Sequence, residues 1–223
     1  MVPRPPDRQG ARRLIGRRAV VGGLAGALVF PHLILPARAA ERVPTPAQTE
    51  GPFYPDVLPA DTDADLVTVR GGAGGGPARG TVTHLFGRVR DPDGRPVPDA
   101  LVEIWQCDAG GVYHHSRGGG GRDAGFQGYG RARARGGADY HFRTIRPVPY
   151  PGRTPHIHFK VQADGFQLTT QMYVAGEPGN GRDFLYRAIR DPRQRAAVTV
   201  ALDPAGDLEA GALRGRFDIV LGG

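Results

Sequence analysis

Cysteine is almost absent from this chain, because Cys107 is the only one among its 223 residues. A lone cysteine excludes an internal disulfide, so a hydrophobic core or a bound metal must stabilise the fold. We expect Cys107 to pack as a small apolar residue beside Trp105. The N-terminal segment contains no cysteine, which excludes a lipid-anchored lipoprotein of the usual kind. Internal repeats and heptad patterns are missing as well.

An excess of charge is also missing once the first 39 residues are set aside. The whole chain has 29 basic and 22 acidic side chains, a formal charge of +7 and a pI near 10.1. Residues 1–39 hold seven of the arginines and one acid, Asp7, which leaves 22 basic and 21 acidic residues in the remainder. A nearly neutral remainder has no sequence-independent attraction for phosphate backbones. We therefore predict no binding to nucleic acid.

Residues 1–39 have the order of an export signal. An arginine-rich start precedes an apolar stretch over 19–35, and Ala37-Arg38-Ala39 forms a small-residue cleavage site ahead of Ala40. An uncleaved membrane anchor is the alternative, but the stretch is short for a span and is interrupted by Pro31 and Pro36. We expect an exported protein, periplasmic or extracellular, with no membrane attachment after the signal is removed.

The pair Arg17-Arg18 stands directly before the apolar stretch. That position fits the twin-arginine route, which exports proteins already folded around a cofactor. The following Ala19-Val20-Val21 is a loose match, so ordinary secretion stays open.

The remainder of the chain predicts an extended arm followed by one all-β domain. Residues 40–80 are rich in proline at first and in glycine over 71–80, a composition that favours extended chain and a flexible loop. From residue 81 onward, short alternating runs are separated by turn residues, which is typical of an antiparallel β-sandwich with long active-site loops. The expected domains are thus 1–39, 40–80 and 81–223.

Seven strands and one helix are expected within that domain. Asp91-Pro92-Asp93-Gly94 supplies the turn between the first two strands, and a helix over Asp183–Ile189 should stop before Pro192. A compact domain would carry the long loop over 108–139 only for a function. The expected strands are Val82–Arg90, Ala100–Gln106, Tyr140–Ile145, His156–Ala163, Leu168–Val174, Ala197–Leu202 and Arg216–Leu221.

Two histidines on one predicted strand are the strongest local feature. In His156-Ile157-His158-Phe159-Lys160-Val161, strand alternation places His156 and His158 on one face and the apolar residues on the core face. Two imidazoles at this spacing can reach a single metal. A polar strand face that happens to contain two histidines is the alternative.

Two tyrosines in nearby loops give the histidines a context. Tyr113 follows Gly110-Gly111-Val112, and Tyr150 stands only six residues before His156. A zinc site would normally add cysteine or carboxylate ligands, and neither is evident beside the pair. Phenolate oxygen is a hard anionic donor, so two tyrosines with two histidines would favour ferric over ferrous iron, and a bound cation would help the phenols to ionise. Without the histidines, each tyrosine is better explained by a packed ring with a satisfied hydroxyl.

Several further motifs stand in order around these residues. They are Thr49-Glu50-Gly51-Pro52-Phe53-Tyr54-Pro55, Gly87-Arg88-Val89, Leu101-Val102-Glu103-Ile104-Trp105-Gln106, Gly111-Val112-Tyr113, Phe142-Arg143-Thr144-Ile145, Pro149-Tyr150-Pro151 and His156-Ile157-His158-Phe159. Together they resemble the intradiol ring-cleavage dioxygenases, such as protocatechuate and catechol dioxygenases, over roughly 49–174. Because no helical domain precedes the sandwich, the layout is closer to a single protocatechuate-type subunit.

The resemblance implies an enzyme that cleaves a catechol with O2 to a cis,cis-muconate-type diacid. It implies one non-haem ferric ion per chain, bound by Tyr113, Tyr150, His156 and His158, with Tyr150 displaced when substrate binds. Arg153 would match the family's arginine beside the catecholate, and Gln171 a polar group of the same pocket. The bland alternatives are an exposed turn arginine and a solvated strand position.

A different class of protein is the main competing hypothesis. The stretch from Gly87-Arg88-Val89 to Ala100-Leu101-Val102 also resembles transthyretin-like and carboxypeptidase regulatory-like modules, which bind without catalysis. Such a module would explain the first two strands but not the ordered set of tyrosines, arginine and histidines. The sequence leaves open which catechol is used and whether the protein forms a homo-oligomer.

Overall fold

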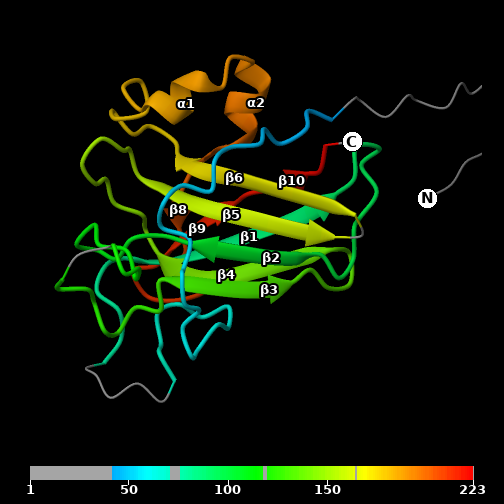
Figure 1. The fold of residues 1–223 in the computed structure, drawn as a ribbon. Helices are drawn as coiled ribbons and strands as arrows, with labels where there is room; N and C mark the ends of the chain where they lie inside the picture. The colour runs from blue at the N-terminus through cyan, green and yellow to red at the C-terminus, as the bar shows by residue number, and fades with distance from the viewer. Residues whose placement is uncertain (1–41, 71–75, 118–119, 164, 223) are drawn as a thin grey trace, which may run out of the picture. The chain divides into compact units, whose positions relative to one another are not determined.

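Two sheets packed against each other form the body of this computed structural model, which describes residues 42–70, 76–117, 120–163 and 165–222 (Figure 1). Each sheet has five strands within that part of the chain. The first contains β1 (Val82–Arg90), β4 (Asp139–Ile145), β8 (Asp203–Pro204), β9 (Leu213–Arg216) and β10 (Ile219–Val220). The second, with order β3-β2-β5-β6-β7, contains β2 (Leu101–Trp105), β3 (Tyr129–Arg133), β5 (His156–Ala163), β6 (Phe166–Val174) and β7 (Thr199–Val200).

Strand pairing in both sheets is mixed. In the second sheet β5 pairs antiparallel with β2 and β6, but β6 pairs parallel with β7. In the first sheet β1 pairs antiparallel with β4 and parallel with β9 and β10, which follow one another along its other edge. The expected β-sandwich is confirmed, but the expectation that its strands are all antiparallel is wrong for these short C-terminal strands.

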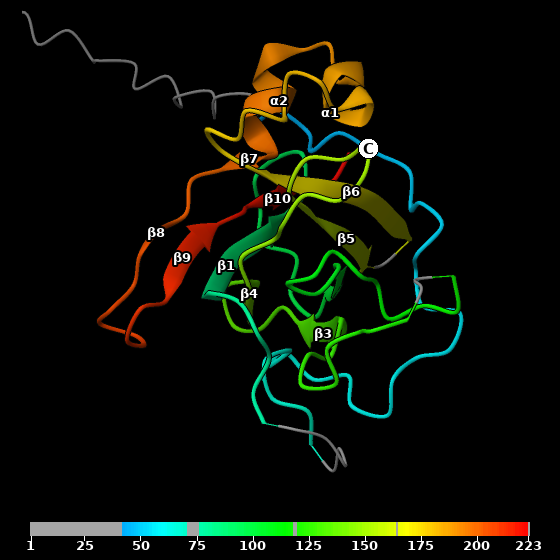
Figure 2. The same cartoon turned by 90° about the vertical axis from the view of Figure 1, so that its left-hand side faces the viewer.

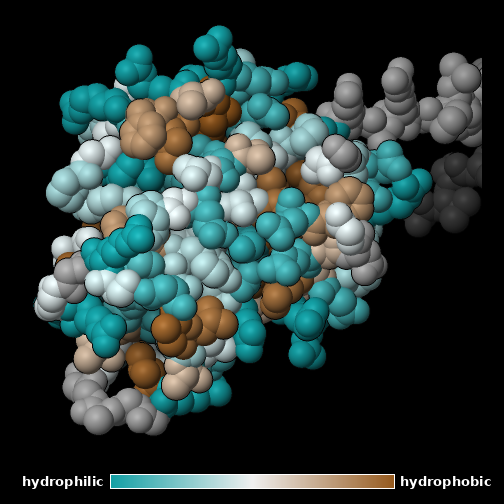
Figure 3. All heavy atoms as spheres, in the orientation of Figure 1, coloured by the Kyte–Doolittle hydropathy of each residue, from teal (hydrophilic) through white to brown (hydrophobic). Residues whose placement is uncertain are grey.

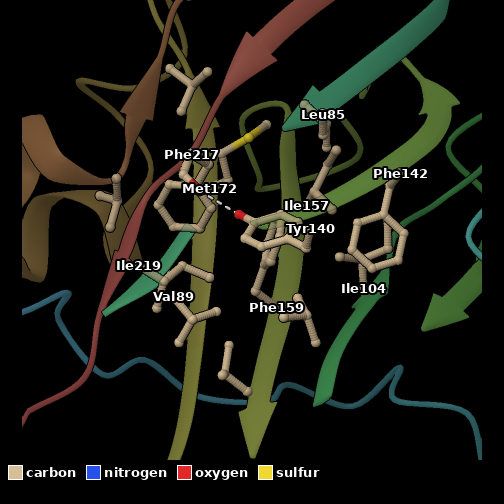
Figure 4. Packing of buried hydrophobic residues seen from close by; sticks show 14 of the residues in the cluster. Leu85, Val89, Ile104, Tyr140, Phe142, Ile157, Phe159, Met172, Phe217 and Ile219 are labelled. Atoms are coloured by element: carbon tan, nitrogen blue, oxygen red, sulfur yellow. Dashed lines mark hydrogen bonds between the residues drawn. The ribbon is translucent and has the colours of Figure 1, made fainter. Parts of the chain in front are cut away.

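The hydrophobic core lies between the sheets, where alternate residues of each strand meet (Figure 4). Ile157, Phe159 and Val161 of β5 point into it, as the alternation predicts. Phe159 meets Phe217 edge to face, with 4.9 Å between ring centroids. The hydroxyl of Tyr140, which is buried in this core, donates to the backbone oxygen of Phe217. Because the side chains on one face of β5 are buried in this core, those on the opposite face must point away from it.

An arm over 42–63 crosses the outer face of the second sheet without forming a helix or strand (Figure 1). Gln48 N donates to Thr169 O of β6 at 2.8 Å, and Arg131 N of β3 donates to Thr62 O at 3.0 Å. The arm comes so near β3 that a Cβ at Gly130 would stand 2.6 Å from Asp63 O, so glycine is required there. The central part of this face is mostly hydrophilic (Figure 3).

The sequence missed strand β3 within the expected long loop. Its residues Tyr129-Gly130-Arg131-Ala132-Arg133 have no apolar alternation, and their pairing with β2 sets their conformation. The expectation of one continuous loop over 108–139 is therefore wrong at Tyr129–Arg133. The expected strands over 197–202 and 216–221 also differ, because only Thr199–Val200 pairs in the first and the second divides between β9 and β10.

Two short helices lie at the edge of the second sheet, beside β6 and β7 (Figure 2). α1 (Phe184–Ala188) begins after Asp183, whose side chain accepts from Leu185 N and Tyr186 N, so the predicted helix is confirmed. α2 (Pro192–Ala197) was not expected, because Pro192 was interpreted as a stop. It stands instead at the first turn of a new helix, where a missing N–H costs nothing.

No helix in the described part of the chain is long and apolar enough to cross a membrane. The predicted export signal, residues 1–39, and the glycines over 71–75 lie outside the described residues.

Candidate metal centre and active site

The two histidines of β5 lie on its outward face, opposite the core. His156 and His158 are 1% and 2% exposed, because the arm and neighbouring loops cover them. Trp105, the partner of His158 on β2, stacks on its ring with 4.8 Å between centroids and 14° between planes. The two imidazoles are therefore enclosed within the protein rather than exposed to solvent.

Tight turns place the two tyrosines above this face. The buried Asp108 accepts from Gly110 N at 2.8 Å and from Val112 N at 3.0 Å, which directs Tyr113 toward the histidines. A second turn, in which Arg153 N donates to Tyr150 O at 2.9 Å, brings Tyr150 beside them. The rings of Tyr113 and Tyr150 meet edge-on at 5.6 Å.

Three donor atoms converge at the centre of this group. Nε2 of His156 is 3.2 Å from Nε2 of His158 and 3.4 Å from the hydroxyl oxygen of Tyr113. Nδ1 of His156 stands 2.7 Å from Thr154 O, which can only accept. Nδ1 must therefore carry the proton, and Nε2 presents a lone pair to the centre. The ring of Tyr150 lies 5.4 Å from that of His156 and closes the group on one side.

Burial shifts the pKa of every member of the group. It lowers the pKa of His156 to about 4, and the charge of Arg153 adds to the effect. Burial, His156 and Arg153 together lower the pKa of His158 well below its usual value. Burial also raises the pKa of both Tyr113 and Tyr150. Near neutral pH the imidazoles are thus neutral, and the phenols keep their protons unless a cation compensates their charge.

These features fit a small, hard metal ion. Ligands about 2.1 Å from one ion, at tetrahedral or right angles, stand about 3.0 to 3.4 Å apart, and both distances from His156 Nε2 fall in that range. Phenolate oxygens with imidazole nitrogens are a donor set for ferric iron. In the described part of the chain, no three His, Cys, Asp or Glu side chains form a group that could hold a metal. The candidate centre therefore depends on its tyrosines.

Arg153 and Gln171 lie next to the group, and neither is solvated. The Arg153 side chain is 9% exposed, and its Nε donates to Asp183 Oδ2 at 2.8 Å. Its Nη2 donates to Gln171 Oε1 at 2.5 Å, and its Nη1 is 3.5 Å from the hydroxyl of Tyr150. The alternatives of an exposed turn arginine and a solvated strand glutamine are both wrong. A cavity of about 360 Å3 opens beside Tyr150 and Arg153.

Known proteins resemble this chain in sequence and fold. The Dioxygenase family, Dioxygenase_C, matches residues 49–223. The chain is 37% identical over 180 residues to the protocatechuate 3,4-dioxygenase beta chain of Burkholderia cepacia, which covers 75% of this chain and 74% of that protein. The chain belongs to the intradiol ring-cleavage dioxygenase family.

Two further relatives show how much of each protein corresponds. Hydroxyquinol 1,2-dioxygenase from Corynebacterium glutamicum is 36% identical over 60% of this chain, which spans only 47% of that relative's length. The structure of the dioxygenase domain of a dioxygenase carbohydrate-binding protein fusion, from the cellulolytic bacterium Streptomyces sp. SirexAA-E, superposes with a TM-score of 0.60 at 34% identity. It covers 80% of this chain and 98% of that domain. Membership of an enzyme family favours catalysis over the transthyretin-like or carboxypeptidase regulatory-like module.

Several other aromatic residues of this intradiol dioxygenase lie beside the site, but His141 lies on the first sheet, away from it. Tyr54 and Tyr129 both hydrogen-bond Glu103. His115 is nearly buried and meets Phe53 edge-on at 5.9 Å, whereas His141 is exposed on β4 and pairs with His84. Cys107 is buried in one cluster with Trp105, as expected.

Asp183 is the residue near the site that sequence reasoning missed. Its side chain is fully buried, and Oδ2 accepts from Arg153 Nε and from Thr154 N at 3.0 Å, while Oδ1 caps α1. Burial raises the pKa of this carboxyl, but hydrogen bonds from Tyr186 N, Arg153 and Thr154 N outweigh it, and the net pKa is lowered. The predicted start of the helix could reveal that Asp183 caps α1. Only the fold shows that the same carboxylate holds Arg153.

Asp183→Asn is expected to lower turnover about tenfold, because a neutral amide binds the guanidinium less firmly than a carboxylate does. Asparagine can still cap α1 through Oδ1, but the buried guanidinium loses its ion pair, so the protein should also be destabilised by about 3 kcal/mol or more. Steady-state rates and thermal melts on the same preparation test this. Wild-type turnover in Asp183→Asn would show that Arg153 does not depend on its bond to Asp183. The matched control is Asp191→Asn, which changes the N-cap of α2.

Proposed function

We propose that this protein is a non-haem Fe(III)-dependent intradiol dioxygenase that uses O2 to open a catechol-type ring between its two hydroxyl-bearing carbons. The product would be a cis,cis-muconate-type diacid. The observation that supports it best is the convergence of Tyr113 Oη, His156 Nε2 and His158 Nε2, with Tyr150 beside them. These four side chains would hold one iron per chain.

When bound there, a ferric ion would supply Lewis-acid chemistry to the two oxygens of the catechol. Tyr150 is the more exposed of the two tyrosines, and it borders the cavity. Its phenolate oxygen can take a proton from an incoming catechol hydroxyl, which frees Tyr150 to move aside. Tyr113 is buried and packed under Phe53, with 4.6 Å between ring centroids, so it would stay in place.

Arg153 would stabilise negative charge that builds on the ring. Its guanidinium is held by Asp183 and Gln171 before substrate arrives, so little reorganisation is needed during the reaction. The same contacts direct Nη1 toward the Tyr150 hydroxyl, where a catechol oxygen would enter. Gln171 would act in substrate binding through this pairing.

The substrate is proposed only as a class. Protocatechuate, catechol and hydroxyquinol, which name the relatives, all carry two neighbouring ring hydroxyls. The proposed centre would bind these two hydroxyls. The other substituents on the substrate ring are not specified by this binding. Substrate and O2 are the proposed partners.

Iron analysis combined with a substrate panel tests this function. Purified mature protein should contain about one iron per chain, show a tyrosinate-to-iron charge-transfer colour, and convert at least one simple, chlorinated, carboxylated or hydroxylated catechol to a ring-opened diacid. Protein that is loaded with iron but yields only ring-opened products cleaved outside the diol would contradict the intradiol assignment. Failure to bind iron would contradict the centre itself.

Export is also proposed, on the order of basic, apolar and small residues in 1–39. We expect the mature N-terminus to be Ala40 when the full chain is produced in an exporting host. Sequencing that terminus tests the proposal, and a mature protein that retains Arg17 and Arg18 would contradict it. Replacing both arginines by lysine should block export through the twin-arginine route and leave ordinary secretion intact.

A further inference from the structure

The arm forms a wall of the candidate site. Gly51 has φ +75°, and a Cβ there would stand 3.4 Å from His158 Cε1, so its backbone passes directly over that ring. Phe53 stacks on Tyr113 and meets Tyr150 edge-on at 6.4 Å. The position of 50–54 therefore helps to set the shape of the space above the histidines.

Two polar contacts fasten this part of the arm to the sheet. The hydroxyl of Tyr54 donates to Glu103 Oε1 at 3.2 Å, and Glu50 pairs with Lys160 Nζ at 2.8 Å. Lys160 Nζ also lies 4.4 Å from the Tyr54 ring centroid, a cation–π contact. Glu103 and Lys160 are register partners on β2 and β5, so both contacts reach the same place on the sheet.

Glu103 is a buried carboxylate on the outer face of the second sheet. It is 4% exposed, and its carboxylate accepts from three side chains: Tyr54, Tyr129 and Gln162. A buried carboxylate is tolerated only when it is well hydrogen-bonded. Tyr129 and Gln162 come from the sheet itself, so Tyr54 is the member that joins the carboxylate to the arm.

Tyr54 is also in contact with the site. Its ring meets Trp105 edge-on at 5.0 Å, and Trp105 stacks on His158. We propose that Tyr54 and Glu103, assisted by Glu50 and Lys160, form a latch that holds 50–54 over the metal-binding face. Tyr54 and Glu103 are then positioning residues that set the substrate wall made by Phe53. This role rests on the proposed function, whereas the attachment of the arm does not.

The test compares Tyr54→Phe with Tyr129→Phe. Each change removes one hydroxyl from the same carboxylate and keeps the ring, but only Tyr54 belongs to the arm. In iron-free protein, hydrogen exchange over 48–57 should become about tenfold faster in Tyr54→Phe and stay near wild type in Tyr129→Phe. In iron-loaded protein, Tyr54→Phe should raise KM for a catechol several-fold with kcat and iron content little changed.

Each outcome decides one part of the proposal. If hydrogen exchange over 48–57 is the same in both variants, the Tyr54 hydroxyl does not hold the arm in particular. That result would overturn the latch. Faster exchange with an unchanged KM would overturn the positioning role. The exchange measurement needs neither iron nor turnover, so an inactive wild-type enzyme would contradict the proposed function without affecting the result for the latch.

Discussion

Replacing His158 by alanine is expected to remove iron from the protein and to abolish ring cleavage. The change deletes one of three converging donor atoms and leaves a void beside Trp105 that cannot bind a cation. Loss of groups that merely orient a metal ligand weakens binding by about 10- to 100-fold, so loss of a direct ligand should exceed that range. Metal analysis after reconstitution, together with the charge-transfer absorption, measures the effect.

His141→Ala is the matched control for this prediction. His141 lies on β4 of the other sheet and is exposed, and its Nε2 is 3.1 Å from Nδ1 of His84 rather than near the tyrosines. Its loss should leave iron content, colour and turnover near wild type. If His158→Ala binds iron as well as His141→Ala does, the proposed centre is wrong.

Arg153→Ala is expected to lower turnover by about 10² or more while iron and colour stay largely intact, as for other fixed groups that stabilise charge. Arg153→Lys should recover little. Nε, Nη1 and Nη2 face Asp183, Tyr150 and Gln171 at the same time, and an ammonium cannot make these contacts together. Iron content and steady-state rate, measured on the same preparations, separate loss of catalysis from loss of metal.

Stability needs its own control in this experiment. Arg153→Ala leaves the buried carboxylate of Asp183 without its ion pair, and breaking such a pair costs about 3 kcal/mol or more. Combining Arg153→Ala with Asp183→Asn removes the uncompensated charge and should recover much of the lost melting temperature. Turnover should stay low in the double variant. Recovery of turnover together with stability would mean that Arg153 serves only the fold.

The sequence by itself determined the parts of this protein that depend on local pattern. Strand alternation predicted the bounds of β1 and β5 and placed His156 and His158 on one face, because side chains alternate about a strand whatever it packs against. The sequence likewise predicted a short helix over Asp183–Ile189, within one residue of α1 at each end. The ordered motifs were enough to predict the family that the comparisons confirm.

Only the tertiary structure decided what depends on residues far apart in the chain. β3 has no apolar pattern of its own and becomes a strand through its hydrogen bonds to β2. The ion pair of Arg153 with Asp183 spans 30 positions, and the bond from Tyr54 to Glu103 spans 49. Such contacts leave no periodic trace in the sequence, because each depends on where the sheet brings two segments together.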